Sequence, residues 1–155
     1  MVDVSMVSKW VVLLVDDEPD NMELVAETLR FFGLTVRTAK DGVEGLEVLK
    51  EFTPDLVLLD LSMPKMDGWE MRQRIKSNPA TANVPVVALS AHAMAGDKER
   101  AIEGGFDGYL TKPVNIATIL ADLKATLDEN YKPQPVPSVI SGVDYFGGNG
   151  KEDGA

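Results

Sequence analysis

The sequence predicts an α/β fold in which a five-stranded parallel sheet carries helices on both faces. Five short apolar segments alternate along the chain with five segments of helical character. Such alternation is typical of parallel strands that are joined by right-handed crossovers. The central apolar run, residues 56–59, contains no polar residue, as expected for a strand that is buried on both faces. With 155 residues, the chain is long enough for one domain with a hydrophobic core.

The first apolar segment, residues 10–15, is expected to be a strand because it is uninterrupted and of strand length. Pro19 suits the first turn of a helix, and apolar residues recur at helical spacing as far as Phe32. Gly33 is expected to close that helix, because glycine adopts the left-handed conformation common at such ends. Residues 34–39 alternate apolar and polar side chains, which indicates a shorter strand.

The middle of the chain supplies a second helix, the central strand and a third helix. Asp41 and Glu44 resemble a capping box and predict a helix that Pro54 ends. The central strand follows and ends in Asp60, directly before a group of turn residues. A third helix is expected over about residues 69–77, where an Asn-Pro pair ends it.

The last part of the chain repeats the pattern twice more. Residues 84–89 form another apolar run, and residues 91–103 are expected to be a helix of weak amphipathicity. Residues 106–110 predict a last short strand. Asn115 is a good cap for a final helix whose apolar residues recur as far as Leu127.

Composition and charge narrow the class of protein. The net charge is −10, from 25 acidic and 15 basic residues, which argues against direct binding of nucleic acid. The chain has no cysteine, so disulfides, thiolate metal sites and cysteine nucleophiles are excluded. The apolar run at residues 10–15 is far too short to span a bilayer and lacks the layout of a signal peptide. We therefore expect a cytoplasmic protein without a membrane segment.

The chain is expected to divide into three segments. Residues 1–9 form a short polar lead-in, and residues 10–131 hold all ten expected elements. The composition then shifts, and residues 132–155 form a Pro- and Gly-rich tail, typical of extended or disordered chain.

Polar residues follow the apolar strands at the points where the strands end. Asp16, Asp17 and Glu18 follow the first strand, Asp60 ends the central one, and Ser90 and Lys112 follow the last two. Each residue alone is most simply a turn or cap former. In a parallel sheet, however, all these strand ends lie at one edge, which is also where open α/β sheets bind their ligands. We therefore expect these six side chains to be neighbours.

Crowded carboxylates need a compensating charge. Two like charges ~4 Å apart repel by about 4 kcal/mol at an effective dielectric constant near 20. A hard divalent cation relieves this repulsion, and Mg²⁺ binds one or two carboxylates together with water and phosphate oxygens. The carboxylate of Asp60 at this strand end has three possible roles: metal ligand, nucleophile or helix cap. With a Mg²⁺ ion, Lys112 and Ser90 around it, this carboxylate has the surroundings to attack phosphorus and form an aspartyl phosphate.

Four short motifs occur in an order and at separations that together are highly specific: Val15-Asp16-Asp17-Glu18, Leu58-Leu59-Asp60-Leu61-Ser62-Met63-Pro64 with Asp67-Gly68, Leu89-Ser90-Ala91, and Tyr109-Leu110-Thr111-Lys112-Pro113. On these motifs the sequence resembles the receiver domain of two-component response regulators, of the single-domain, CheY-like or DivK-like type. The resemblance covers about Lys9 to Tyr131, so residues 10–131 are the expected receiver domain. It implies a flavodoxin-like, doubly wound (βα)5 fold with strand order 2-1-3-4-5.

The resemblance implies a role for each acidic residue of the site. Asp60 would be the phosphoacceptor. Asp17, Asp60 and the backbone carbonyl of Ser62 would hold Mg²⁺, and Asp16 would act through water. Lys112 would pair with the phosphoryl group, and its peptide bond to the following proline would be cis.

The resemblance also implies a switch. Ser90 would bond a phosphoryl oxygen and move inward, and Tyr109 would rotate towards the space that Ser90 leaves. The plainer interpretation of Tyr109 is a partly buried aromatic with its hydroxyl in water. His92, two residues after Ser90, holds a position that tunes phosphoryl lifetime in this family, although an exposed histidine at a helix start is the simpler interpretation.

The implied partners are proteins. The phosphoryl donor would be a histidine kinase or a histidine phosphotransfer protein, and the output would be a downstream protein target. A homodimer would use the face made by the fourth helix, the fifth strand and the fifth helix. Such a protein catalyses its own phosphorylation and dephosphorylation but is not a turnover enzyme.

Other functions on this fold remain open at this stage. The chain would serve equally as a receiver domain cut from a hybrid histidine kinase. A phosphatase with an aspartyl-phosphate intermediate would need a second aspartate two residues after Asp60, where the chain has Ser62. A flavin or nucleotide protein would need a Gly- or Ser-rich loop after the first strand, where the chain is acidic. A scaffold protein that never binds phosphate would give no role to the acidic, hydroxyl and amine side chains at the strand ends.

Overall fold

Five parallel strands and five helices alternate along the part of the chain that the structure describes. The structure is a computed structural model. The expectations for the N-terminal lead-in, for His92 and for the C-terminal tail lie outside the described residues, and their outcome stays a prediction. The described residues are 9–63, 65–91 and 96–131.

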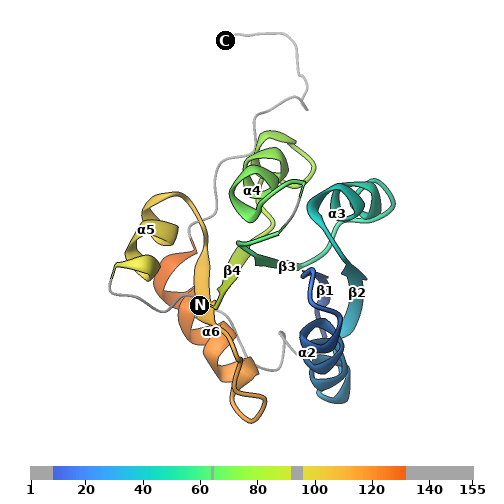
Figure 1. The fold of residues 1–155 in the computed structure, drawn as a ribbon, viewed down its shortest axis with the longest axis vertical. Coiled ribbons are helices and arrows are strands. Elements are labelled where there is room, and N and C mark those ends of the chain that lie inside the picture. Colours follow the sequence, from blue (N-terminus) through green and yellow to red (C-terminus); the bar gives the residue numbers. More distant parts are fainter. Residues whose placement is uncertain (1–8, 64, 92–95, 132–155) are drawn as a thin grey trace, which may run out of the picture.

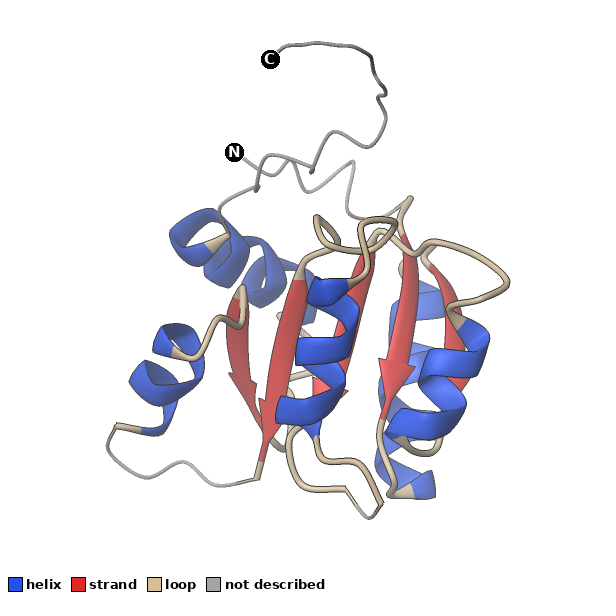
Figure 2. Cartoon of the chain, turned by 90° about the horizontal axis from the view of Figure 1, so that it is seen from above, coloured by secondary structure: helices blue, strands red, loops and turns tan. Residues whose placement is uncertain are grey.

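The strands form one parallel sheet of the expected topology. Their order is β2-β1-β3-β4-β5, as the resemblance implied. Figure 2 shows the strands side by side, with their arrowheads pointing to the same edge. The strands are β1 (Val11–Val15), β2 (Thr35–Ala39), β3 (Leu56–Asp60), β4 (Val86–Ser90) and β5 (Gly108–Thr111).

The helices cover both faces of the sheet. Figure 1 shows α2 and α6 on one side, and α3, α4 and α5 on the other. Among the described residues, no helix combines the length and apolar composition that crossing a bilayer requires. The helices are α2 (Pro19–Phe31), α3 (Gly42–Val48), α4 (Gly68–Ser77), α5 (Asp97–Glu103) and α6 (Ile119–Asn130).

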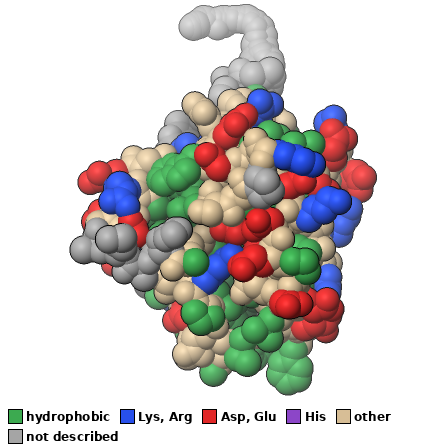
Figure 3. All heavy atoms as spheres, viewed as in Figure 1, with side chains coloured by type: hydrophobic (Ala, Val, Ile, Leu, Met, Phe, Trp, Pro, Cys, Tyr) green, Lys and Arg blue, Asp and Glu red, His purple; other side chains and the backbone are tan. Residues whose placement is uncertain are grey.

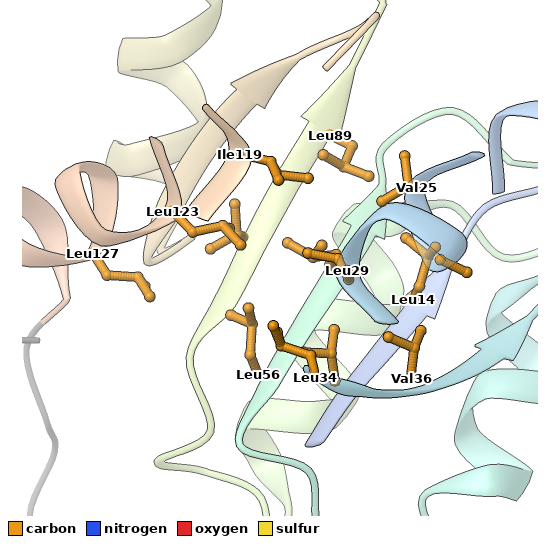
Figure 4. Packing of buried hydrophobic residues seen from close by; sticks show 14 residues of the cluster. Leu14, Val25, Leu29, Leu34, Val36, Leu56, Leu89, Ile119, Leu123 and Leu127 are labelled. Atoms are coloured by element: carbon orange, nitrogen blue, oxygen red, sulfur yellow. The ribbon is translucent and has the colours of Figure 1, made fainter. Parts of the chain in front are cut away.

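The central strands separate two hydrophobic clusters. Every residue of β3 and β4 is buried, which is why these sequences show apolar runs rather than alternation. Leu29 of α2 and Leu123 of α6 pack in one cluster with Leu56 of β3 (Figure 4). Met71 of α4 packs in the other cluster with Leu59. Because both faces of the sheet are packed, the strand ends are held rigidly at its edges.

Several predicted helix ends are observed. Pro19 is the first residue of α2, and Gly33 follows that helix at φ 101°. Asp41 caps α3, because its Oδ1 accepts the Glu44 N–H at 2.8 Å. In a capping box, the glutamate side chain accepts the N–H of the cap residue, here Asp41. Glu44 Oε1 instead accepts the N–H of the preceding residue, Lys40, at 2.6 Å.

The final helix begins later than the sequence predicted. Asn115 Oδ1 accepts the N–H of Ala117 at 2.9 Å, which closes a local turn instead of capping a helix. Ile116 remains 47% exposed. The helix α6 starts only after Thr118, so the prediction that Asn115 caps it was wrong.

The helix expected over residues 91–103 is shorter among the described residues. Helix α5 begins at Asp97, and Ala91 lies outside it. Gly96 precedes α5 at φ 90°, a left-handed conformation that a right-handed helix cannot continue through. The backbone at Gly96 therefore separates α5 from the end of β4.

The edge of the sheet opposite the strand ends is stabilised by a partly buried ion pair. Asp107 Oδ2 accepts from Lys76 Nζ at 2.8 Å and from the N–H of Val86 at 2.9 Å. We expect Asp107→Ala to lower the free energy of unfolding by about 2–3 kcal/mol, because it leaves the partly buried Lys76 ammonium without its counter-charge and the buried Val86 N–H without its acceptor. In the matched variant Glu47→Ala, which breaks the exposed pair with Lys50, the loss should stay below about 0.5 kcal/mol. Urea unfolding measures both, and equal losses would contradict the expectation.

Candidate functional site

Three carboxylates meet at the carboxyl edge of the sheet. Asp16 and Asp17 follow β1, and Asp60 is the last residue of β3. One carboxylate oxygen from each lies within 4.8 Å of the others. Asp16 and Asp60 are 0% and 4% exposed, whereas Asp17 is exposed. On the face seen in Figure 3, acidic side chains gather near the middle with a basic side chain beside them.

Lys112 directly follows the outermost strand, β5, and brings a positive charge to these carboxylates. Its Nζ lies 3.0 Å from Asp16 Oδ2 and 3.1 Å from Asp60 Oδ2. A third carboxylate oxygen, Oε1 of Glu18, lies 3.2 Å from the same Nζ. The Lys112–Pro113 peptide bond is cis, as the resemblance implied. One buried ammonium therefore joins residues that are almost a hundred positions apart in the chain.

The surroundings of Asp60 oppose its ionisation. Burial raises the pKa of Asp60 from 3.8 to about 6, and the charge of Asp16 adds to that rise. The Ser62 N–H, which donates to Asp60 Oδ1 at 3.1 Å, and the Lys112 ammonium both act in the opposite direction. Because burial is the largest of these causes, the folded site disfavours the charged form of Asp60.

Lys112 stays protonated. Burial lowers the pKa of its ammonium, but the hydrogen bonds to Asp16 and Asp60 outweigh that effect and raise the pKa above its ordinary value. The ammonium is therefore a permanent charge of the site at neutral pH.

The loop after Asp60 returns close to the strand end. Gly68 N–H donates to the Leu61 carbonyl at 3.1 Å. A Cβ at Gly68 would lie 2.5 Å from the Asp60 carbonyl oxygen, a distance that real side chains do not adopt. Glycine is therefore required at this position for a steric reason, and it fixes the backbone that carries Ser62.

Ser90 and Tyr109 share a second part of the site. Ser90 ends β4 and is 5% exposed. Tyr109 is 8% exposed, which makes it more deeply buried than the partly buried position that the sequence left open. They border a hollow of about 310 Å³, which is lined by Leu61, Ser62, Trp69, Ser90, Asp97, Arg100 and Tyr109.

One residue at the site, Asn21, was missed by the sequence reasoning. Glu18 belongs to the acidic group after the first strand, and its side chain contacts Lys112 and makes no cap bond. Asn21 was not singled out, yet its Nδ2 donates to Asp16 Oδ2 at 2.6 Å. The sequence signal that pointed to Asn21 was its position in the first helical turn after the acidic strand end.

The donor set fits a hard divalent cation. Asp16, Asp17 and Asp60 offer oxygen atoms only, and such ligands suit Mg²⁺ better than a softer metal. The arrangement thus joins a buried carboxylate, a candidate cation position and a fixed ammonium.

The chain belongs to the response regulator receiver domain family, whose model matches residues 12–124. The transcriptional regulator RpaA of Synechocystis, described as DNA-binding, is 38% identical over 116 residues, or 75% of this chain and 48% of that protein. The chain thus spans about half the length of that relative. The polar-differentiation response regulator DivK of Brucella anthropi is 31% identical over 118 residues, or 76% of this chain and 96% of DivK.

A solved structure shows the same fold. The receiver domain of the sensor histidine kinase PA1611 from Pseudomonas aeruginosa superposes with a TM-score of 0.69 at 29% identity. The match covers 77% of this chain and 98% of that domain. That structure contains a magnesium ion coordinated in its active-site cleft.

The charge balance at Asp60 predicts a pH-dependent stability without divalent metal. Because the pKa of Asp60 is higher in the folded protein, the unfolded chain releases the proton first, and the free energy of unfolding falls as pH rises from about 4 to about 6. Asp60→Asn should remove this loss and be more stable than the wild type by about 1–2 kcal/mol at pH 8, after allowance for solvent screening. The gain should disappear near pH 4. Urea unfolding in EDTA at both pH values measures it, and a gain independent of pH would contradict the assignment.

The close approach at Gly68 predicts a steric effect on the site. Gly68→Ala should lower the free energy of unfolding by about 2–3 kcal/mol, because the Asp60 backbone cannot move aside cheaply. It should also shift the amide resonances of Leu61 and Ser62. Gly42→Ala is the matched control, since its nearest neighbour is the flexible Met66 side chain at 3.0 Å. A smaller loss at Gly68 than at Gly42 would show that the loop is not fixed in this way.

Proposed function

We propose that Asp60 accepts a phosphoryl group from a histidine kinase or a histidine phosphotransfer protein, in a reaction that requires Mg²⁺. The observation that carries the proposal is the buried Asp60 carboxylate, held between Asp16 and Lys112 at the end of a central strand. Membership of the receiver family and the magnesium ion in the PA1611 receiver support it.

The chemistry is a direct phosphoryl transfer. A carboxylate oxygen of Asp60 attacks phosphorus, the bond between phosphorus and the donor nitrogen breaks, and the imidazole leaves with its electron pair and takes up a proton. Asp16, Asp17, Asp60 and the backbone carbonyl of Ser62 would hold Mg²⁺. The bound ion would supply positive charge to the phosphoryl oxygens. The Lys112 ammonium, 3.1 Å from Asp60 Oδ2, would compensate the remaining charge on those oxygens.

The proposed output is a change in a protein-binding surface. Ser90 donates its hydroxyl to the phosphoryl oxygen and moves towards Asp60, and Tyr109 follows into the space beside it. Both residues border the hollow next to α4 and α5. Tyr109 also borders a wider hollow of about 600 Å³, which β5 lines together with α5 and α6. Lys98 Nζ and Glu129 Oε1, 3.2 Å apart, join α5 to α6 across this face.

The face of α5, β5 and α6 is the proposed site for a downstream protein or a second copy of the chain. It corresponds to the fourth helix, fifth strand and fifth helix in chain order. We place this switch in the cytoplasm, where it reacts once in each signalling cycle rather than as a turnover enzyme. The same chemistry serves whether residues 10–131 act alone or within a longer regulator or hybrid kinase.

Direct phosphorylation tests the proposal. Incubation with acetyl phosphate and Mg²⁺ should add one phosphoryl group to the wild-type chain and none to Asp60→Asn, as measured by intact mass. EDTA should abolish the gain, because the carboxylate pocket then repels the incoming phosphate. Asp55→Asn, which neutralises an exposed carboxylate just before the same strand, should react like the wild type. A wild-type chain that gains no mass, or an unchanged gain in Asp60→Asn, would refute the proposal.

A further inference from the structure

The side chain of Asn21 reaches back from the first turn of α2 to the acidic strand end. Its Nδ2 lies 2.6 Å from Oδ2 of Asp16, a carboxylate that is 0% exposed. Asn21 itself is only partly exposed. The contact is not part of the helix cap, since Glu18 is the cap residue of α2. The helix cap therefore does not account for the hydrogen bond between the Asn21 amide and the buried Asp16 carboxylate.

The hydrogen bonds of Asp16 show what this amide does. Asp16 Oδ1 accepts the Glu18 N–H at 2.9 Å, and Oδ2 accepts from both Asn21 and Lys112. A carboxylate has about four acceptor directions, so three are occupied. The carboxylate therefore has a fixed orientation, with the remaining acceptor direction at Oδ1.

The side chains of Lys112 and Asn21, which both donate to Asp16, differ in their other contacts. The Lys112 ammonium also contacts Asp60 and Glu18, so Asp16 holds only a share of it. A phosphoryl group on Asp60 would take up a larger part of that charge. The amide of Asn21 makes no other hydrogen bond among the described residues. It also carries no net charge, so it orients Asp16 without opposing a cation at the carboxylates.

We infer that Asn21 is a positioning residue, whose amide holds the Asp16 carboxylate in the orientation that completes the cation site with Asp17 and Asp60. The inference rests on the proposed function for the identity of the cation. It goes further in naming a residue that is neither a ligand nor a phosphoryl contact. Groups that orient metal ligands in this way typically change metal affinity by 10–100-fold when removed.

A titration with Mg²⁺ alone tests the inference without phosphorylation. In the full chain, the amide resonances of Asp17 and Asp60 report the binding midpoint. Asn21→Leu, which keeps the size of the side chain but cannot donate, should raise the midpoint by about tenfold. Asn21→Ala repeats the comparison in case leucine disturbs the fold, and Asn21→Gln, which keeps the amide, should recover most of the affinity. Glu23→Gln, an exposed change on the same helix, should leave the midpoint unchanged.

Hydrogen exchange in the metal-free protein supplies a second measurement. The Glu18 N–H donates to Asp16 Oδ1, so it should exchange faster in Asn21→Leu than in the wild type, while amides in the middle of α2 keep their rates. A purely structural role of Asn21 would instead speed exchange throughout α2 and leave the Mg²⁺ midpoint in place.

The outcomes separate this inference from the proposed function. If the midpoint changes by less than about twofold in both Asn21→Leu and Asn21→Ala, Asn21 does not position Asp16, whatever happens to phosphorylation. If Asn21 variants weaken Mg²⁺ binding but the wild type gains no phosphoryl group from acetyl phosphate, the positioning role stands and the phosphoacceptor proposal fails.

Discussion

The site depends on one ammonium group shared between buried carboxylates. Lys112 follows the last strand of the sheet, and its Nζ lies within 3.2 Å of oxygens of Asp16, Glu18 and Asp60. Like charges this close repel strongly in a partly buried pocket, so the acids require a cation beside them. The parallel sheet makes this arrangement possible, because it brings the ends of β1, β3 and β5 to the same edge. Burial nevertheless keeps the pKa of Asp60 above its ordinary value.

The polar site is held by rigid packing beneath and around it. Two hydrophobic clusters fix the strands, and the loops that carry the charged groups are fixed by local contacts. Gly68 lets the loop after Asp60 fold back against the strand end, where any larger residue would collide with the backbone. Asn21 orients Asp16 from the first turn of α2. The Asp16 and Asp60 carboxylates are therefore held in place by hydrogen bonds and by Lys112, which preorganises them for a cation and a phosphoryl group.

The family relation and the geometry support the same chemistry from different directions. The chain belongs to the response regulator receiver domain family, and its relatives include a regulator that the match covers to 96% and a transcriptional regulator that it covers to 48%. The fold also matches a receiver taken from a histidine kinase. These proteins differ in what surrounds the domain. We therefore expect the identity of partners to depend on the outer face of α5, β5 and α6, while the carboxylate and ammonium chemistry stays at the sheet edge.

The sequence alone determined the sheet, its alternation with helices, and the positions of the acids, Ser90 and Lys112 at strand ends, because apolar runs and turn residues are local signals. It misplaced the start of α6, since Asn115 closes a turn with Ala117 and local patterns do not distinguish that turn from a cap. It placed Glu18 and Lys112 at the same edge without fixing their contact, and it gave no sign that Asn21 contacts Asp16. Those contacts were decided by tertiary structure, because a hydrogen-bond partner depends on where the crossovers bring each strand end and helix start in space.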